Sequence, residues 1–166
     1  MGGPRPIGLI DLDVWEKPML RYGITKVLEV PIGYAYAWCT DFRDDDAKIV
    51  GVPFPRHILR KRRGEYVWIQ RYIRGGKEKE GVRFITLEPP NAWHNEAIGD
   101  EKESSIDYRL TPMGKKRTRL TITVRATYKT MEPEAKSGLE DILSRDWDKY
   151  GAALEKDYAS GKAATA

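Results

Sequence analysis

The longest regular pattern of apolar positions along the chain lies near its C-terminus, over residues 137–160. Large apolar side chains recur there every three or four residues, which is the spacing of one face of an α-helix. Charged residues fall mostly between them, so the pattern predicts a helix about 36 Å long with one buried and one solvated face. The buried stripe is expected to contain Leu139, Leu143, Trp147, Tyr150, Leu154 and Tyr158, widened by Ile142 and Ala153.

Between residues 55 and 130 the pattern changes to short extended runs separated by Gly, Pro and charged turns, which predicts β-strands. In the clearest run, 117–129, apolar residues alternate with polar ones, as in a strand with one covered face. Predicted strands cover 23–30, 57–63, 65–74, 80–87, 92–99, 104–111 and 117–129, and two short helices, 33–41 and 44–50, follow the first. Because the turns between later strands are short, we expect sequential antiparallel pairing.

These elements predict an α+β fold in which a seven-stranded antiparallel sheet covers the long C-terminal helix. A chain of 166 residues fits one domain, which we place at 23–160. Residues 1–22 are expected to form an arm that packs either on this domain or on a neighbouring subunit, and the second arrangement would make the protein a homodimer. Residues 161–166 are expected to form a disordered tail.

Several short stretches carry a resemblance to a known superfamily: Ala37-Trp38-Cys39-Thr40-Asp41-Phe42, Pro89-Pro90, and Tyr108-Arg109-Leu110-Thr111-Pro112. Together with the terminal helix and the order of elements, they resemble the helix-grip fold of the START-like superfamily. That superfamily includes the pollen-allergen-like, lipid-transfer and polyketide cyclase/dehydrase families. The resemblance covers about residues 24–158. It implies a curved sheet wrapped around the long helix, with a cavity between them for a hydrophobic or amphipathic small molecule, such as a lipid, an isoprenoid or a polyketide.

Aromatic and amphipathic side chains that would face such a cavity are the candidate ligand-binding residues. On the strand 65–74, the aromatic face and the face of Val67, Ile69 and Ile73 alternate, and the alternation alone leaves open which of them is inside. For every candidate the alternative is plain core packing. The candidates are Trp38, Tyr66, Trp68, Gln70, Tyr72, Trp93, Tyr108, Tyr128, Trp147 and Tyr150.

The candidates for catalysis are His94 and Glu96, which share a strand face and would act as an acid/base pair in a cyclase/dehydratase-type enzyme. Pairs with this spacing also occur by chance. Neither histidine has Cys, Asp or a second His at a ligand spacing, so we expect no metal and no cofactor. The superfamily has no shared catalytic motif, so the choice between carrier and enzyme stays open, and we favour the carrier.

Net charge is +4 and the pI is near 9.1, yet acids and bases are interspersed along most of the chain, which disfavours a nucleic-acid partner. The exception is a basic segment that we define as residues 56–63. It fits a charged edge strand, an anchor for an anionic head group or, with Tyr66 and Trp68 nearby, an RNA-binding surface. Together with the outer face of the sheet it would suit a protein-interaction or RNA-binding module, which is the least favoured class of function. Strict alternation would place Arg60 and Arg62 on the face of Ile58, and Lys61 on the opposite face.

No apolar run has membrane-spanning length and the N-terminus lacks the pattern of a signal peptide, so we expect a cytoplasmic protein without membrane insertion. The single cysteine, Cys39, excludes an intramolecular disulfide. Charged residues make up 33% of the chain and glutamine is nearly absent, a composition that favours a thermophilic source.

Overall fold

The structure is a computed structural model that describes residues 19–74, 76–129 and 136–164. Seven strands form one antiparallel sheet in the order β1-β7-β6-β5-β4-β3-β2. The strands are β1 (Leu20–Leu28), β2 (His57–Arg62), β3 (Glu65–Arg74), β4 (Lys77–Glu88), β5 (Ala92–Gly99), β6 (Lys102–Pro112) and β7 (Thr118–Tyr128). Helix α1 (Ile32–Cys39) and a short 3₁₀ helix (Asp46–Val50) lie between β1 and β2, and α2 (Lys136–Ala159) follows β7. The α+β helix-grip architecture expected from the sequence is confirmed.

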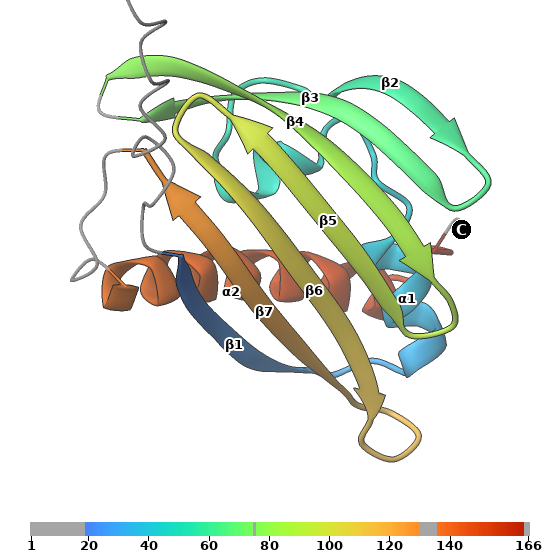
Figure 1. Ribbon diagram of the computed structural model, residues 1–166. Coiled ribbons are helices and arrows are strands. Elements are labelled where there is room, and N and C mark those ends of the chain that lie inside the picture. Colours follow the sequence, from blue (N-terminus) through green and yellow to red (C-terminus); the bar gives the residue numbers. More distant parts are fainter. Residues whose placement is uncertain (1–18, 75, 130–135, 165–166) are drawn as a thin grey trace, which may run out of the picture.

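Short turns make β2 to β7 a continuous meander, and β1 pairs with β7 at the opposite edge from β2. The sheet curves around α2, with α1 near the C-terminal end of that helix (Figure 1). Tyr34 of α1 packs edge-on against Tyr158 of α2, with ring centres 4.8 Å apart. The face of the sheet that meets α2 is called the inner face below, and the opposite one the outer face.

The core lies where the inner face of β1, β6 and β7 meets α2. In β7 the predicted alternation is present: Leu120, Ile122 and Val124 are buried, whereas the residues between them are largely exposed. On α2, Leu154 is fully buried. Gly151 lets the helix approach the sheet closely, because a Cβ at this position would lie 3.3 Å from a methyl carbon of Leu28. This packing fixes which face of α2 points at the sheet.

Several predicted details differ in the structure. Strand β1 begins at Leu20 and β4 at Lys77, each three residues before the predicted start. The second short helix is a 3₁₀ helix, which ends at Gly51 in the left-handed region at φ +80°. Ile142 and Tyr158, which were placed in the buried stripe of α2, are 43% and 42% exposed because they lie at the margin of the helix–sheet contact.

The expected division into an N-terminal arm, one domain and a tail stays a prediction. Most of the expected arm lies outside the described residues, although Leu20 and Tyr22 belong to β1. In the expected tail, the backbone N–H of Lys162 donates to Asp157, and its carbonyl accepts from the Tyr34 hydroxyl. No helix within the described ranges is long and apolar enough to cross a membrane.

Candidate functional site

A cavity of about 110 Å³ lies between the inner face of the sheet, the α1 region and α2. Strands β3 to β6 each place side chains inward, and α1, the segment between α1 and β2, and α2 close the remaining sides. It is called the aromatic cavity below. Its lining residues are Trp38, Cys39, Phe42, Asp46, Arg56, Trp68, Ile85, Trp93, Asn95, Tyr108, Trp147 and Tyr150.

The aromatic rings of this wall contact one another in a continuous series from the sheet to the helix. Trp93 and Tyr108 are cross-strand partners in β5 and β6, so their rings stack, 4.7 Å apart and 9° from parallel. Tyr108 in turn contacts Trp147, with ring centres 5.9 Å apart, and Trp147 contacts Tyr150 at 5.3 Å. On the other side Phe42 packs on Trp68 at 5.2 Å. The wall therefore offers flat apolar area from several directions, which suits a small apolar molecule.

Three polar residues interrupt this aromatic wall. Arg56 donates a hydrogen bond to Asp46 at 2.8 Å, and its guanidinium lies 4.7 Å from the centre of the Trp68 ring. Asn95 points inward from β5, between Trp93 and Ala97 on the same face. Within the described part of the chain, two buried atoms of this wall have no hydrogen-bond partner: the side-chain oxygen of Asn95 and Nε of Arg56. Such atoms are rare in folded proteins, since a buried polar atom without a partner costs free energy.

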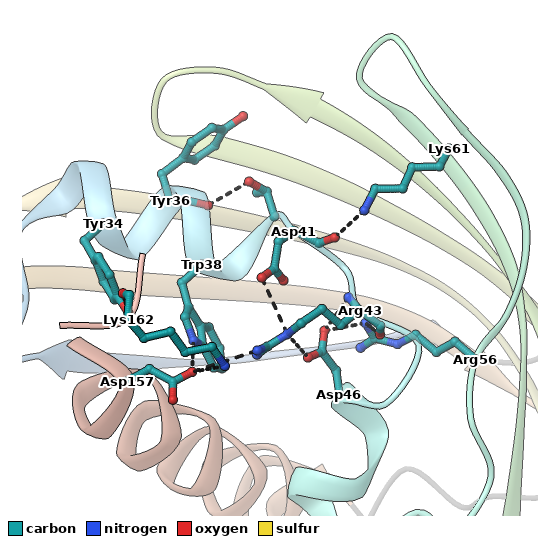
Figure 2. A network of polar contacts seen from close by, with 11 residues as sticks. Tyr34, Tyr36, Trp38, Asp41, Arg43, Asp46, Arg56, Lys61, Asp157 and Lys162 are labelled. Carbon is teal, nitrogen blue, oxygen red and sulfur yellow. Dashed lines mark hydrogen bonds and ion pairs between the residues drawn. The ribbon is translucent and has the colours of Figure 1, made fainter. Parts of the chain in front are cut away.

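A polar network lies at one end of the cavity, where α1, the 3₁₀ helix, β2 and α2 meet (Figure 2). Arg43 lies at its centre, with Nε 3.1 Å from Asp46 and 3.5 Å from Asp41, and Nη1 3.9 Å from Asp157. Asp157 of α2 also accepts from the indole N–H of Trp38 at 2.9 Å. Because Asp46 and Trp38 line the cavity, this network positions part of its wall.

The cavity wall disfavours charge on three of its ionisable side chains, Tyr150, Tyr108 and Cys39. Burial raises the pKa of Tyr150 to about 12, and burial also raises the pKa of Tyr108. Burial raises the pKa of the Cys39 thiol as well, with a smaller contribution from Asp41. At neutral pH all three groups therefore hold their protons, so the wall presents them as neutral hydrogen-bonding and apolar groups.

The structure separates the ten predicted ligand-binding residues into three groups. Six of them line the aromatic cavity: Trp38, Trp68, Trp93, Tyr108, Trp147 and Tyr150. Gln70 and Tyr72 also lie on the inner face but line a second depression, and Tyr66 packs on Phe42 at 5.1 Å. Tyr128 is buried in the core, where its hydroxyl lies 3.0 Å from that of Tyr22. The aromatic face of β3 is thus the inner one, and Ile73 on the other face is 57% exposed.

Sequence reasoning missed several lining residues, and only some of them had a detectable signal. Ile85 and Asn95 share strand faces with other inward residues, so the period of two in β4 and β5 could have identified them once one neighbour was placed. Phe42 and Asp46 follow α1 in a segment without periodicity. Their place in the wall depends on how that segment folds over the sheet, for which the sequence carries no pattern.

The candidate catalytic pair, His94 and Glu96, lies on the outer face and does not reach the cavity, because Trp93 and Asn95 are the inward residues of β5. His94 is held between two carboxylates, with Nε2 2.5 Å from Glu96 and Nδ1 2.6 Å from Asp107. Arg125 bonds the other oxygen of Asp107 at 3.1 Å. Burial lowers the pKa of His94, but the hydrogen bonds to the two carboxylates outweigh it and raise the pKa above its ordinary value. This arrangement is a cross-strand charge cluster on the solvated side of the sheet.

The face assignment within the basic segment is wrong. The register of β2 shifts between Ile58 and Arg60, so that Ile58 pairs with Trp68 while Lys61 pairs with Tyr66. A β-bulge adds one residue and reverses the alternation beyond it. Lys61 therefore points inward, where its ammonium donates to the Asp41 carbonyl at 2.7 Å, and Arg60 lies on the outer face.

No group of three or more metal-binding side chains is assembled among the residues that the structure describes. No protein-family model matches the chain, and no curated protein matches it.

Solved structures do match the fold. An aromatase/cyclase, Zhui, from Streptomyces sp. R1128 superimposes with a TM-score of 0.67 at 17% identity, over 84% of this chain and 93% of that one. A START superfamily protein from Mycobacterium smegmatis gives 0.63 at 13% identity, over 82% and 94%. The major latex-like protein 151 of Panax ginseng gives 0.62 at 10% identity, over 82% and 97%. The fold that the resemblance implies is thereby confirmed: the chain shares the helix-grip fold with these three proteins.

Proposed function

We propose that this protein binds a small hydrophobic or amphipathic molecule in the aromatic cavity. The observation that carries the proposal is the combination of an aromatic wall with two unpaired polar atoms, the Asn95 side-chain oxygen and Arg56 Nε. Aromatic rings bind apolar surface, whereas a buried acceptor and a buried donor each need a partner. A molecule with an apolar body and a hydroxyl or carbonyl group satisfies both requirements.

The volume of the cavity limits the part of the ligand that it can hold. Engineered apolar cavities of about 150 Å³ bind benzene, so a cavity of about 110 Å³ accommodates one small ring or a short branched chain. The branched units of isoprenoids and the rings of aromatic polyketides are groups of this kind. A larger ligand would require Trp147 and Tyr150 to move, and their partial exposure makes them the wall residues best able to do so.

An enzyme of the cyclase/dehydratase type is the second candidate, because one protein with this fold is an aromatase/cyclase. The ionisable groups of the wall favour binding over acid–base catalysis. Tyr108 and Tyr150 have raised pKa values and stay protonated at neutral pH, while Asp46 and Arg56 are bonded to each other. A general acid or base works best with a pKa near the operating pH, and neither tyrosine meets that condition.

Titration with p-cresol and toluene tests the proposal, because the two probes share a ring and differ in the hydroxyl that would donate to Asn95. Trp38, Trp68, Trp93 and Trp147 line the cavity, so bound probe should change the tryptophan fluorescence. We expect saturable binding of one p-cresol per chain, tighter than that of toluene. The preference for p-cresol should disappear in Asn95→Leu, since the acceptor is then absent.

A matched pair of variants locates the binding. Ile85→Trp fills the cavity, because Ile85 is buried in its wall, whereas Phe84→Trp adds the same ring on the outer face, where Phe84 is 43% exposed. We expect the first variant to lose p-cresol binding and the second to retain it. If the folded parent protein binds neither probe saturably up to their solubility limits, the proposed function is wrong.

A further inference from the structure

A second depression lies on the inner face, next to the aromatic cavity and towards the β3–β4 and β5–β6 turns. It is small, with a volume of about 10 Å³. It is called the cationic depression below, because it contains two basic side chains, one from β4 and one from β6. Its lining residues are Gln70, Tyr72, Gly81, Arg83, Ala97, Ile98, Gly99 and Lys102.

Arg83 lies in the cationic depression, next to the strand positions that line the aromatic cavity. In the sheet it is the cross-strand partner of Trp68 and Ala97, and it lies two residues before Ile85 on the same face. Two residues of a strand span about 7 Å, so its guanidinium is within reach of a molecule in the aromatic cavity. Burial lowers the pKa of Arg83, while the neighbouring Tyr108 hydroxyl, from the wall of the cavity, opposes this.

No carboxylate of the described residues lies within ion-pair distance of Arg83, and no hydrogen bond from its guanidinium to a described residue is formed. This is unusual for an inward arginine, because buried charges are normally paired. Its cross-strand neighbours on the inner face are an indole and a methyl group. The guanidinium therefore retains its full capacity to bind an anion.

Lys102 adds a second unpaired cation. Its ammonium lies 3.5 Å from the Tyr128 hydroxyl and 5.4 Å from the centre of that ring, and it has no ion-pair partner among the described residues. The nearby acid, Glu101, is paired with Arg74 at 3.2 Å. Burial, together with Arg83 and Arg74, lowers the pKa of Lys102 to about 7. Arg83 thus destabilises the charged form of Lys102, and an anion between the two would relieve that repulsion.

We propose that Arg83 and Lys102 bind the anionic group of the ligand, a carboxylate, while its apolar part occupies the aromatic cavity. This inference rests on the proposed function and adds the class of ligand, an apolar carboxylic acid. The planar guanidinium can bind both carboxylate oxygens, and charge-assisted hydrogen bonds are stronger than neutral ones. The Tyr72 hydroxyl lines the same depression and can add a neutral donor. The anion site is thus on the inner face of β4 and β6, and the basic segment 56–63 is not required for it.

Hydrocinnamate and hydrocinnamyl alcohol form a matched pair of probes, because they differ only in the group that would meet Arg83. Calorimetric titration below pH 7, where Lys102 carries its proton, should show tighter binding of the acid than of the alcohol. Arg83→Gln and Lys102→Gln should each weaken the binding of the acid by about ten- to a hundredfold and leave the affinity for the alcohol unchanged. The control is Arg119→Gln, which removes the same charge from an exposed position on the outer face.

The pH dependence of binding supplies an independent measurement. As the pH rises from 6 to 9, Lys102 loses its proton, so the affinity of the parent protein for the acid should fall while its affinity for the alcohol stays constant. Lys102→Gln should remove this dependence. If the parent binds the acid no more tightly than the alcohol, or if Arg83→Gln weakens both probes equally, the anion site is refuted while the proposed function stands. If neither probe binds the folded parent, both are refuted.

Discussion

Two substitutions by alanine in α2 should lower the free energy of unfolding by different amounts, and the smaller of the two side chains should cause the larger loss. Leu154 is fully buried between the helix and the sheet. Trp147 is larger, yet it is only partly buried and borders the aromatic cavity. We predict that Leu154→Ala destabilises the protein more than Trp147→Ala does.

The magnitudes follow from what each side chain contacts. Leu154→Ala removes apolar surface from a closed site and leaves a void, which costs about 3 to 5 kcal/mol. Trp147→Ala extends a cavity that already exists, so little new void is created. Its main losses are the ring contacts with Tyr108 and Tyr150, each about 0.5 to 1.5 kcal/mol, and part of its apolar burial. With about 0.5 kcal/mol for the lost burial of a partly exposed ring, the total is about 1.5 to 3.5 kcal/mol.

Equilibrium unfolding in urea measures both values. With a slope of about 2 kcal/mol per M, Leu154→Ala should lower the midpoint by about 2 M, and Trp147→Ala by about 1 M. Ile142→Ala is the control on the same helix, since Ile142 is 43% exposed and should cost less than about 1 kcal/mol. Equal costs, or a larger cost for Trp147→Ala, would mean that Trp147 packs in a closed core, and the cavity beside it would then be in doubt.

Two further predictions concern the sheet. Gly23→Ala should destabilise the protein by about 2 kcal/mol or more in the same urea assay, because the new Cβ would lie 2.4 Å from the backbone oxygen of Ile122; an unchanged midpoint would contradict this. The hydrogen bonds from His94 to Glu96 and Asp107 raise the pKa of His94 in the folded protein. Their contribution to the free energy of unfolding is therefore fully present below about pH 6.5, the pKa of histidine in the unfolded chain, and is lost as the pH rises through the pKa in the folded protein. The difference in unfolding free energy between the parent and His94→Gln should therefore shrink as the pH rises from 6 to 9, and a constant difference would refute the role of the two carboxylates.

The elements of this fold depend mainly on local patterns, and those could be read from the sequence. The apolar spacing of α2 predicts a helix that the structure places at Lys136–Ala159, within one residue at each end. The alternation of β7 predicts correctly which of its residues are buried. The short turns predict sequential pairing of β2 to β7, because they leave adjacent strands no other partner. Helical and strand periodicity act over a few residues, so no distant contact is needed to recognise them.

The assignment of faces could be predicted only in part. Alternation places Tyr66, Trp68, Gln70 and Tyr72 on one side of β3, but it does not say which side is inner. That is decided by Phe42, which lies far from β3 in the chain and packs on the rings of Tyr66 and Trp68. In β2 the bulge reverses the alternation, and no residue of that segment marks it in the sequence.

The candidate site depended most on tertiary structure. Arg83 and Lys102 are nineteen positions apart and share no motif, yet the registers of β4, β5 and β6 bring both to one depression. The sequence determined that each lies on a strand, because that depends on neighbouring residues. Whether each points inward, and whether an acid pairs with it there, depends on strand pairing and on the curvature of the sheet around α2, which only the folded chain decides.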